Sequence, residues 1–479
     1  MLLQRWQLLA LYACVLTALA WPVLWVDIPV GVDTLNHFAR INVRAHIDTD
    51  PDLARLFEVR NVLVPYLAMD WLLTPFARVM STLTLARVFT VALVWGLVGA
   101  TAVLQRSLLG RWGWEPLSIS LVAWNGLLAW GFLSYVLGII FALLGLAAWN
   151  AGQEWRWYVR LVVTTLISTG LYLTHLLAFM AFALLIVIFI LLPPARSPFK
   201  QLCLLGASFS PLAVLFLYTA TPPPIGDLFI YSMQQKLLGF LTPFLFSGFA
   251  GGYDNGYAVA ICIVLVALAL SFFHSGTVLP ISLRTSLVVA VIGLVLPDVI
   301  SGVYGISTRL PLICCCVVVS GLTVRFCSKR GASIFVAVML TLLFVRIADV
   351  AATMQKFQES YSQARAELEI IPRGSIVVAF LNRTQQEREP YSSIVFEHVA
   401  QLVTIERSGY ATGFFNQLGS VRGRNPANSF ALPSLGSIRA EHLIPHAYIL
   451  MVHLGQSWDL PPGARRILQG TLIDLLALP

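Results

Sequence analysis

Runs of apolar residues, divided by short polar connections, fill residues 1–350 of the chain. Each run is close to the ~20 residues that an α-helix needs to cross the hydrocarbon core of a bilayer. The pattern therefore predicts about eleven membrane-spanning helices. We place them at residues 8–26, 83–105, 116–131, 134–151, 161–174, 176–193, 201–220, 257–273, 285–302, 310–326 and 332–350.

The connection after the first run is too long and too polar to be a simple loop. Residues 27–82 contain seven acidic residues and five arginines. Its apolar part is interrupted by Pro65, Asp70 and Pro75, and a proline breaks or kinks a helix interior. This favours a first outer loop with short helices that lie along the membrane surface.

Residues 351–479 form a separate polar module, with nearly equal numbers of basic and acidic residues. The periodicity predicts helices at Ala352–Ile370 and Tyr391–Arg407, and buried strands at Ser375–Phe380 and Ala447–His453. Alternating helices and strands are typical of a small α/β domain. The predicted fold is thus an all-α polytopic membrane protein, residues 1–350, followed by an α/β domain.

Composition agrees with a membrane protein and adds its orientation. Of the 479 residues, 58% are hydrophobic and 11% are charged, against about 25% charged in soluble domains. Alternate connections hold eleven basic and two acidic residues, which predicts a cytoplasmic N-terminus and an extracytoplasmic C-terminal domain. Ala18-Leu19-Ala20 also resembles a signal-peptidase site, and Asp33 is expected outside whether or not the first span is cleaved. The net charge of +8 reflects this asymmetry and does not indicate nucleic-acid binding.

The stretch from Asp33 to Arg40 follows the first predicted span directly. In a helix, Asp33, His37 and Arg40 lie on one face, because they are spaced at i, i+4 and i+7. Asp33 could act as a general base on an acceptor hydroxyl, with His37 orienting it and Arg40 binding a phosphate. The alternative is a structural helix in which Asp33 is the N-cap and Arg40 snorkels to the lipid surface.

Four further polar residues are candidates for substrate or lipid-phosphate binding. Asp70 interrupts an apolar helix, where an isolated carboxylate is costly unless it faces a polar cavity or pairs with an arginine such as Arg78 or Arg40. His175 lies at a predicted outer hairpin tip, and Arg309 begins a late span at the level of lipid headgroups. For Arg309 the alternative is ordinary anchoring at the membrane interface. Lys236 is a weaker candidate of the same kind.

The C-terminal module offers a possible acceptor-binding lid around Ser408–Asn428, rich in Gly and Asn. A solvated loop is the default interpretation of this segment. Its polar residues are His398, Arg407, Asn416, Gln417, Arg422 and Arg424.

Taken together, these motifs resemble bacterial integral-membrane glycosyltransferases of the GT-C superfamily. The resemblance rests on Asp33-Thr34-Leu35-Asn36-His37-Phe38-Ala39-Arg40 after the first span, and on Asp70 in the first outer loop. Trp130-Gly131-Phe132, Leu173-Thr174-His175, Arg309 and a soluble outer domain complete it. It covers the layout of the whole chain.

The resemblance implies an inverting transfer of sugar from a polyprenyl-phosphate carrier on the outer face of a bacterial inner membrane. Asp33 would be the catalytic base, and Arg309, with Lys236 or Arg40, would neutralise the departing phosphate. The acceptor would be a glycan, a lipid or a protein, and nucleic acid is not an expected partner. Many members have two adjacent acids in this motif, whereas Thr34 follows Asp33 here; a divalent metal therefore stays an open possibility.

A non-enzymatic role is the rival hypothesis: a transporter, or an assembly partner, for lipid-linked envelope glycans. A transporter typically has ionisable groups near the bilayer midplane, broken helices and repeated halves. The predicted spans are nearly free of charge and show no repeat. This pattern favours an enzyme whose site lies at the membrane surface.

Overall fold

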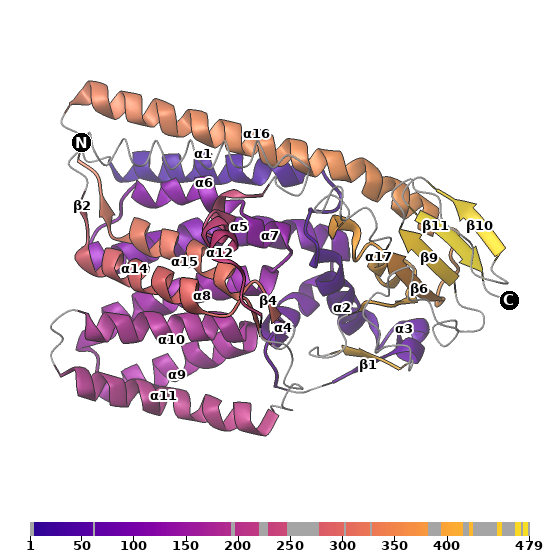
Figure 1. The fold of residues 1–479 in the computed structure, drawn as a ribbon, viewed down its shortest axis with the longest axis horizontal. Helices are drawn as coiled ribbons and strands as arrows, with labels where there is room; N and C mark the ends of the chain where they lie inside the picture. Colours follow the sequence, from indigo (N-terminus) through magenta and orange to yellow (C-terminus); the bar gives the residue numbers. More distant parts are fainter. Residues whose placement is uncertain are drawn as a thin grey trace.

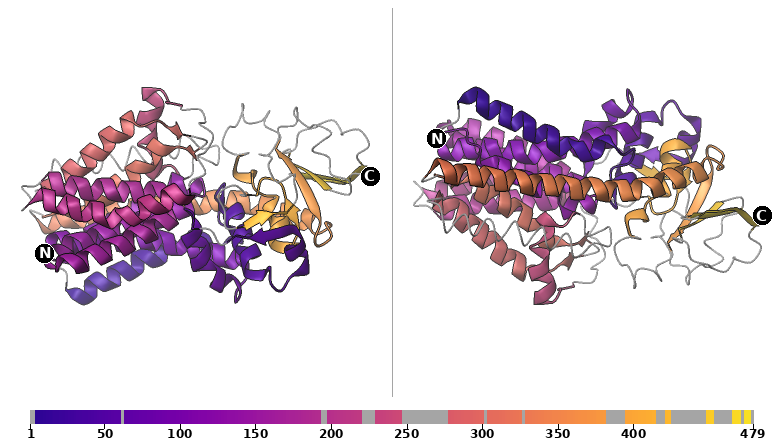
Figure 2. Two further views of the ribbon diagram at one scale, coloured as in Figure 1. Left: turned by 90° about the horizontal axis from the view of Figure 1, so that it is seen from below. Right: turned by 90° about the horizontal axis from the view of Figure 1, so that it is seen from above.

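A computed structural model describes residues 4–60, 63–192, 197–219, 229–246, 277–300, 303–325, 328–381, 394–414, 421–424, 448–452, 465–470 and 473–477. Helices run side by side through most of the molecule, and a small sheet lies at one end (Figure 1). The first residues of the chain and this sheet are at opposite ends, which the two further views confirm (Figure 2).

Five of the described helices are long and apolar enough to cross a membrane. They are α1 (Arg5–Leu24), α5 (Thr82–Leu109), α8 (Leu133–Ala151), α11 (Pro198–Thr219) and α16 (Lys329–Leu368). Beside them lie α9 (Trp157–Thr174) and the shorter apolar helices α10 (Leu176–Leu191), α14 (Pro280–Val295) and α15 (Ile306–Ser320). The chain is therefore a helical protein with several helices of membrane-spanning length. The span predicted at 257–273 lies outside the described residues.

The prediction of a single span at 116–131 is wrong, because this segment is not one helix. It consists of η1 (Glu115–Ile119), α6 (Ser120–Ala123) and α7 (Gly126–Ala129), with a break at Asn125. The Asn125 side chain accepts from the backbone N–H groups of Leu127 and Leu128 and donates to the carbonyls of Val122 and Ala123. Arg346 Nη2 donates to the carbonyl of Trp124 at 2.5 Å. These bonds satisfy polar backbone groups that hydrocarbon would leave unsatisfied.

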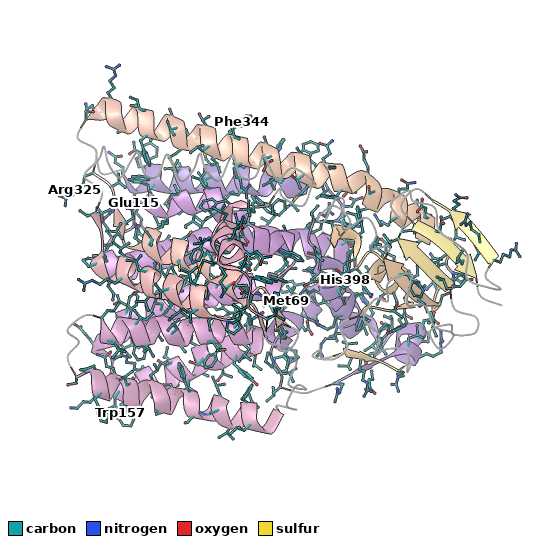
Figure 3. All side chains as sticks on the ribbon, viewed as in Figure 1. Met69, Glu115, Trp157, Arg325, Phe344 and His398 are labelled. Carbon is teal, nitrogen blue, oxygen red and sulfur yellow. The ribbon has the colours of Figure 1, made fainter. Side chains whose placement is uncertain are left out.

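Helix α16 joins two elements that the sequence pattern separated. Its 40 residues include both the predicted span 332–350 and the predicted helix 352–370, and at 1.5 Å per residue it is about 60 Å long. It runs along one side of the bundle, extends past the end of the bundle and ends beside the C-terminal sheet (Figures 1 and 2). Phe344, near its middle, is exposed and points away from the bundle (Figure 3), as expected for a lipid-facing side chain.

The first outer loop contains the short helices that its composition predicts. They are α2 (Thr34–His46), α3 (Pro51–Leu56) and α4 (Leu67–Ala77), with the short strand β1 (Phe57–Val59) between α3 and α4. Helix α2 is buried on nearly all sides, because it lies between the bundle and the C-terminal domain.

Several short elements connect the helices of the bundle. They are η2 (Gly152–Glu154), α12 (Met233–Gly239), η3 (Thr242–Phe244), β2 (Thr277–Val278), β3 (Val299–Ile300), β4 (Val303–Tyr304) and β5 (Leu322–Thr323).

The C-terminal domain is built on a five-stranded mixed sheet in the order β10-β11-β9-β6-β7. Its strands are β6 (Ile376–Leu381), β7 (Tyr410–Ala411), β9 (Tyr448–Val452), β10 (Arg465–Gln469) and β11 (Ile473–Ala477). β6 is parallel to β7 and β9, whereas β11 is antiparallel to both of its neighbours. Both predicted strands are present as β6 and β9. The helix predicted at 391–407 is shorter: η6 (Ile394–Phe396) and α17 (Gln401–Glu406).

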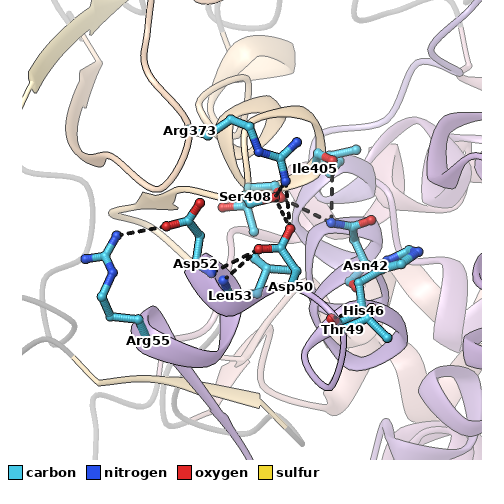
Figure 4. A network of polar contacts seen from close by, with 11 residues as sticks. Asn42, His46, Thr49, Asp50, Asp52, Leu53, Arg55, Arg373, Ile405 and Ser408 are labelled. Atoms are coloured by element: carbon cyan, nitrogen blue, oxygen red, sulfur yellow. Dashed lines mark hydrogen bonds and ion pairs between the residues drawn. The ribbon is translucent and has the colours of Figure 1, made fainter.

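The C-terminal domain is fixed to the first outer loop by backbone pairing, charge and apolar packing. Strand β1 pairs antiparallel with β8 (Val421–Gly423). Asp50 accepts from Arg373 at 2.8 Å and from Ser408 at 2.6 Å, and Asn42 donates to the Ile405 carbonyl (Figure 4). An apolar cluster lies beside these contacts and consists of Ala39, Val43, Leu53, Leu56, Phe57, Tyr410, Phe414 and Val421. Loop and domain therefore form one unit around α2.

Candidate active site

Asp33 lies at the start of α2, where the backbone of the broken helix holds it in place. The Val32 and Asp33 amides donate to the carbonyls of Ala129 and Trp130, at 3.0 and 3.2 Å. Gly131 has a φ of +78°, and a Cβ there would lie 2.5 Å from the Asp33 nitrogen. A glycine is therefore required at this position of the Trp130-Gly131-Phe132 motif. The Asp33 side chain does not cap α2, so its carboxylate remains available for other contacts.

The Asp33 carboxylate faces a histidine from the C-terminal domain. His398 Nε2 lies 3.4 Å from Asp33 Oδ1, and the carboxylate is 22% exposed. Asn36 Nδ2 lies 3.1 Å from His398 Nδ1. An amide nitrogen can only donate, so Nδ1 is the acceptor and a neutral His398 carries its proton on Nε2. In this tautomer the Nε2–H of His398 faces the Asp33 carboxylate.

A second part of the site is the buried pair of Arg40 and Asp70. Their side chains are 3% and 1% exposed, and Arg40 donates three bonds of 2.8–3.0 Å to the Asp70 carboxylate. Arg40 Nη2 also lies 3.3 Å from His37 Nδ1. Burial, together with nearby Arg40 and His398, holds the pKa of His37 well below 6.5. His37 is therefore a neutral ring at pH 7.

Arg309 and His175 form the third part. Arg309 Nη1 lies 3.2 Å from His175 Nε2, and the guanidinium stacks 3.9 Å above the Phe132 ring. The Tyr135 hydroxyl donates to the Arg309 carbonyl at 3.1 Å. The Leu177 amide donates to His175 Nδ1 at 3.1 Å on the other side of the ring. The His175 ring is thus held between the backbone of α10 and the Arg309 guanidinium.

Tyr66 closes this part of the site from the first outer loop. It precedes α4 with a φ of +76°, which is uncommon for a bulky residue. Its ring stands edge-on to the His175 ring, with centroids 4.8 Å apart. Non-glycine residues in such conformations cluster at functional sites.

These three parts lie near one another. Tyr66, Tyr135 and Asp33 are close enough to Arg309 to influence its charge, and His37 is close enough to His175. A carboxylate, a guanidinium and three histidines from α2, the α9–α10 tip, α15 and the C-terminal domain therefore share one region. His398 lies between the bundle and the sheet (Figure 3).

Lys236 lies in a separate buried cluster. Its ammonium donates to the carbonyls of Leu294 and Leu296, at 2.9 and 2.5 Å, and lies 3.4 Å from Asp298 Oδ2. Asp298 accepts from the Tyr231 amide at 2.8 Å and contacts the Ser307 hydroxyl. Lys236 thus connects α12 to the segment between α14 and α15, and its predicted phosphate-binding role stays a prediction.

The structure also decides between several alternatives. Arg40 does not snorkel to lipid, since it is buried against Asp70, and Asp70 takes Arg40 rather than Arg78 as its partner. In the predicted lid, Arg407 donates to the Ile371 carbonyl and Arg424 to the Phe57 carbonyl. Asn416 and Gln417 lie outside the described residues. Among the residues that are described, no group of three or more His, Cys, Asp or Glu side chains could hold a metal ion.

The fold and this cluster define a helical protein with several helices of membrane-spanning length and an α/β domain docked on its first loop. No family model matches the chain, and no curated protein matches it either.

Proposed function

We propose that the protein is an inverting glycosyltransferase. It moves a sugar from a polyprenyl-phosphate carrier to an acceptor hydroxyl on the outer face of the inner membrane. The observation that supports this proposal most is the Asp33 carboxylate, partly exposed and facing His398, in electrostatic range of the buried Arg309. A base and a phosphate-binding cation in one site are what this transfer needs. The resemblance to the GT-C superfamily suggests the same reaction.

In the proposed step, Asp33 removes the proton of the acceptor hydroxyl while the hydroxyl oxygen attacks C1 of the sugar. A new C1–O bond forms on the face opposite the carrier, and the C1–O(phosphate) bond breaks. Its electron pair stays on the phosphate oxygen, so polyprenyl phosphate leaves as the anion. The proton ends on Asp33, and His398 holds the carboxylate in the reactive orientation. Atoms and charges balance without a further reactant.

Arg309 would bind the departing phosphate through its positive charge and its planar fork of N–H groups. His175 Nε2 lies 3.2 Å from Arg309 Nη1 and holds the guanidinium in position. Donors that are fixed before the reaction stabilise developing charge more than mobile water does. The rings of Phe132, Tyr135 and Tyr66 pack around these donors and limit access of water to them.

His37, Arg40 and Asp70 have a supporting role in this proposal. The Arg40–Asp70 pair is fully engaged within the protein, so it holds α2 against α4 and thereby positions Asp33. His37, one turn from Asp33, contacts the same arginine, with its Nδ1 3.3 Å from Arg40 Nη2.

The broken helix at Asn125 is a feature that transporters also use for substrate sites. Here, however, the polar groups freed by the break are satisfied by Asn125 itself and by Arg346. This observation does not favour the transporter hypothesis, since such a site needs polar groups directed at a substrate.

The test is transfer of radiolabelled sugar from polyprenyl-phosphate donors by purified Asp33→Asn protein in detergent or nanodiscs. We expect a loss on the order of 10²–10⁴-fold, the usual contribution of a general base. Asp48→Asn is the matched control, because Asp48 is an exposed acid of the same outer loop. An active wild type whose Asp33→Asn variant transfers sugar as fast as the Asp48→Asn control rules out the proposed base.

A further inference from the structure

A cavity lies at the end of the bundle away from the C-terminal sheet. Its volume is about 710 Å³, and it is bounded by the end of α8, the beginning of α9 and the beginning of α11. Trp157, one of its lining residues, marks this end in Figure 3. The cavity is far from Asp33 along α9, which begins here and ends at the His175 tip.

Arg160 is the charged group buried in this cavity. It is 8% exposed, and its guanidinium stacks 3.8 Å above the Trp149 ring. Within the described residues, neither its Nε nor its Nη2 has a hydrogen-bond acceptor. Leaving such donors buried and unsatisfied is costly, and more so for a charged group. Arg160 lines the cavity, so an anion there can approach its guanidinium through Nη1, the nitrogen that is not among these buried atoms.

The other polar groups of the cavity support an anionic ligand. Lys200 adds a second positive charge, whereas Asn150 and Gln153 already donate to the carbonyls of Ser107 and Trp149. Glu154 is the acid of the lining; it is exposed, and in the part of the chain that the structure describes it forms no ion pair with Arg160 or Lys200. The lining thus has an excess of one positive charge.

The position of the cavity indicates the source of that anion. The helices α8 and α11, both long enough to cross a membrane, have an end at the cavity. Trp155 and Trp157 line it and are exposed, and exposed tryptophans mark the boundary between hydrocarbon and headgroups. An anion at this level that also contacts aromatic rings fits a lipid better than a solute.

We propose that this cavity binds the phosphodiester headgroup of an anionic phospholipid. Arg160 and Lys200 bind the phosphate, and the tryptophans contact the glycerol and the first carbons of the acyl chains. The proposal does not depend on sugar transfer at Asp33. A cationic pocket between helices is the kind of site that retains an anionic lipid.

The experiment is native mass spectrometry of the full chain released from nanodiscs of phosphatidylglycerol and phosphatidylcholine. We expect Arg160→Gln to lower phosphatidylglycerol binding about tenfold or more, since it removes charge-assisted hydrogen bonds to the phosphate. Arg330→Gln is the matched control, because Arg330 is exposed near the start of α16 and does not line the cavity. A second arm adds inorganic phosphate as competitor, which we expect to displace little of the lipid.

Three outcomes would overturn the proposal. Arg160→Gln could retain binding within twofold, Arg330→Gln could lose as much as Arg160→Gln, or inorganic phosphate could displace the lipid completely. If Arg160→Gln does not fold, Lys200→Gln and Glu154→Gln decide the matter. Lys200→Gln is expected to lower and Glu154→Gln to raise phosphatidylglycerol binding by about twofold, the effect of one exposed charge; opposite or absent changes in both contradict the proposal.

Discussion

Arg309 and Arg160 are buried guanidinium groups near opposite ends of α9, and each stacks on an aromatic ring. Arg309 lies 3.9 Å above Phe132, and Arg160 lies 3.8 Å above Trp149. Around Arg309 the chain supplies histidines and the nearby Asp33 carboxylate. Around Arg160 the described residues supply only an exposed acid at the rim and no acceptor for its Nε.

This difference separates a site suited to chemistry from a site suited to binding. Proton transfer needs a base close to the reacting group, held by neighbours that fix its orientation. Retention of an anion needs only donors and a partly dry surface. The end of the bundle near the C-terminal domain has the first set of groups, and the opposite end has the second.

The largest expected effect is on the free energy of unfolding, and it concerns the end of the bundle near the C-terminal domain. Asp70→Asn leaves the buried Arg40 charge without its partner, so we expect the free energy of unfolding to fall by about 3–5 kcal/mol. Arg160→Gln should change it by no more than about 1 kcal/mol, because a stacked cation contributes little and no ion pair is broken. Denaturation in detergent micelles, followed by tryptophan fluorescence, measures both. Equal losses would remove the distinction between the two ends.

The next effect concerns the proposed phosphate contact. Arg309→Gln should lower the transfer rate on the order of 10²–10³-fold, as loss of one donor to a developing anion does. Arg309→Lys keeps the charge but loses the planar fork, and it should recover only part of the rate. Arg160→Gln in the same transfer assay should remain near wild type. An Arg309→Gln variant that folds and transfers sugar normally would exclude this arginine from the reaction.

His398 should have a smaller effect, because it acts through Asp33. His398→Ala is expected to lower kcat on the order of 10-fold to 100-fold, the worth of one hydrogen bond to a charged group, with little change in KM. His398→Gln can still donate an N–H toward the carboxylate and should recover part of kcat. Rescue by glutamine separates orientation of Asp33 from a purely structural role. Equal rates for the alanine and glutamine variants would argue against the orienting bond.

The smallest effect is the pH dependence that His37 adds to stability. Its pKa is lowered in the folded protein, so the unfolded chain binds protons more readily below pH 6.5. Stability is therefore complete above that pH and falls as the pH drops below it, by at most about 1.4 kcal/mol per pH unit. His37→Gln should flatten the fall in thermal midpoint between pH 7 and pH 5.5. An unchanged slope would show that His37 does not contribute to it.

The sequence predicted much of this architecture, and the failures have physical causes. The repeat of apolar positions, every 3.6 residues in a helix and every two in a strand, is a local signal. It therefore predicted the long apolar helices, the short helices of the first loop and strands β6 and β9. The break at Asn125 was not, since the surrounding residues are as apolar as a continuous span. Likewise, nothing in the pattern separates a helix that ends at residue 350 from one that continues to Leu368.

The sequence named several residues of the candidate site, but a common face followed from the pattern only for those that are close along the chain. Asp33, His37 and Arg40 share α2, and their common face follows from helix geometry. His398 contacts Asp33 across 365 positions (33 to 398), so its partner could not be recognised from one sequence. In the sequence, Tyr66 and Tyr135 cannot be distinguished from ordinary aromatic residues of apolar segments. A polar residue in a predicted domain gives no signal of which distant group it faces.

The central claim is that Asp33 supplies the base, and a single-turnover experiment tests it most directly. Wild-type and Asp33→Asn proteins are first saturated with polyprenyl-phosphate sugar, and donor binding is measured separately. The account predicts equal donor binding within about twofold and a transfer step at least about 100-fold slower in Asp33→Asn. A normal transfer step in the variant, or a loss confined to donor binding, would contradict it.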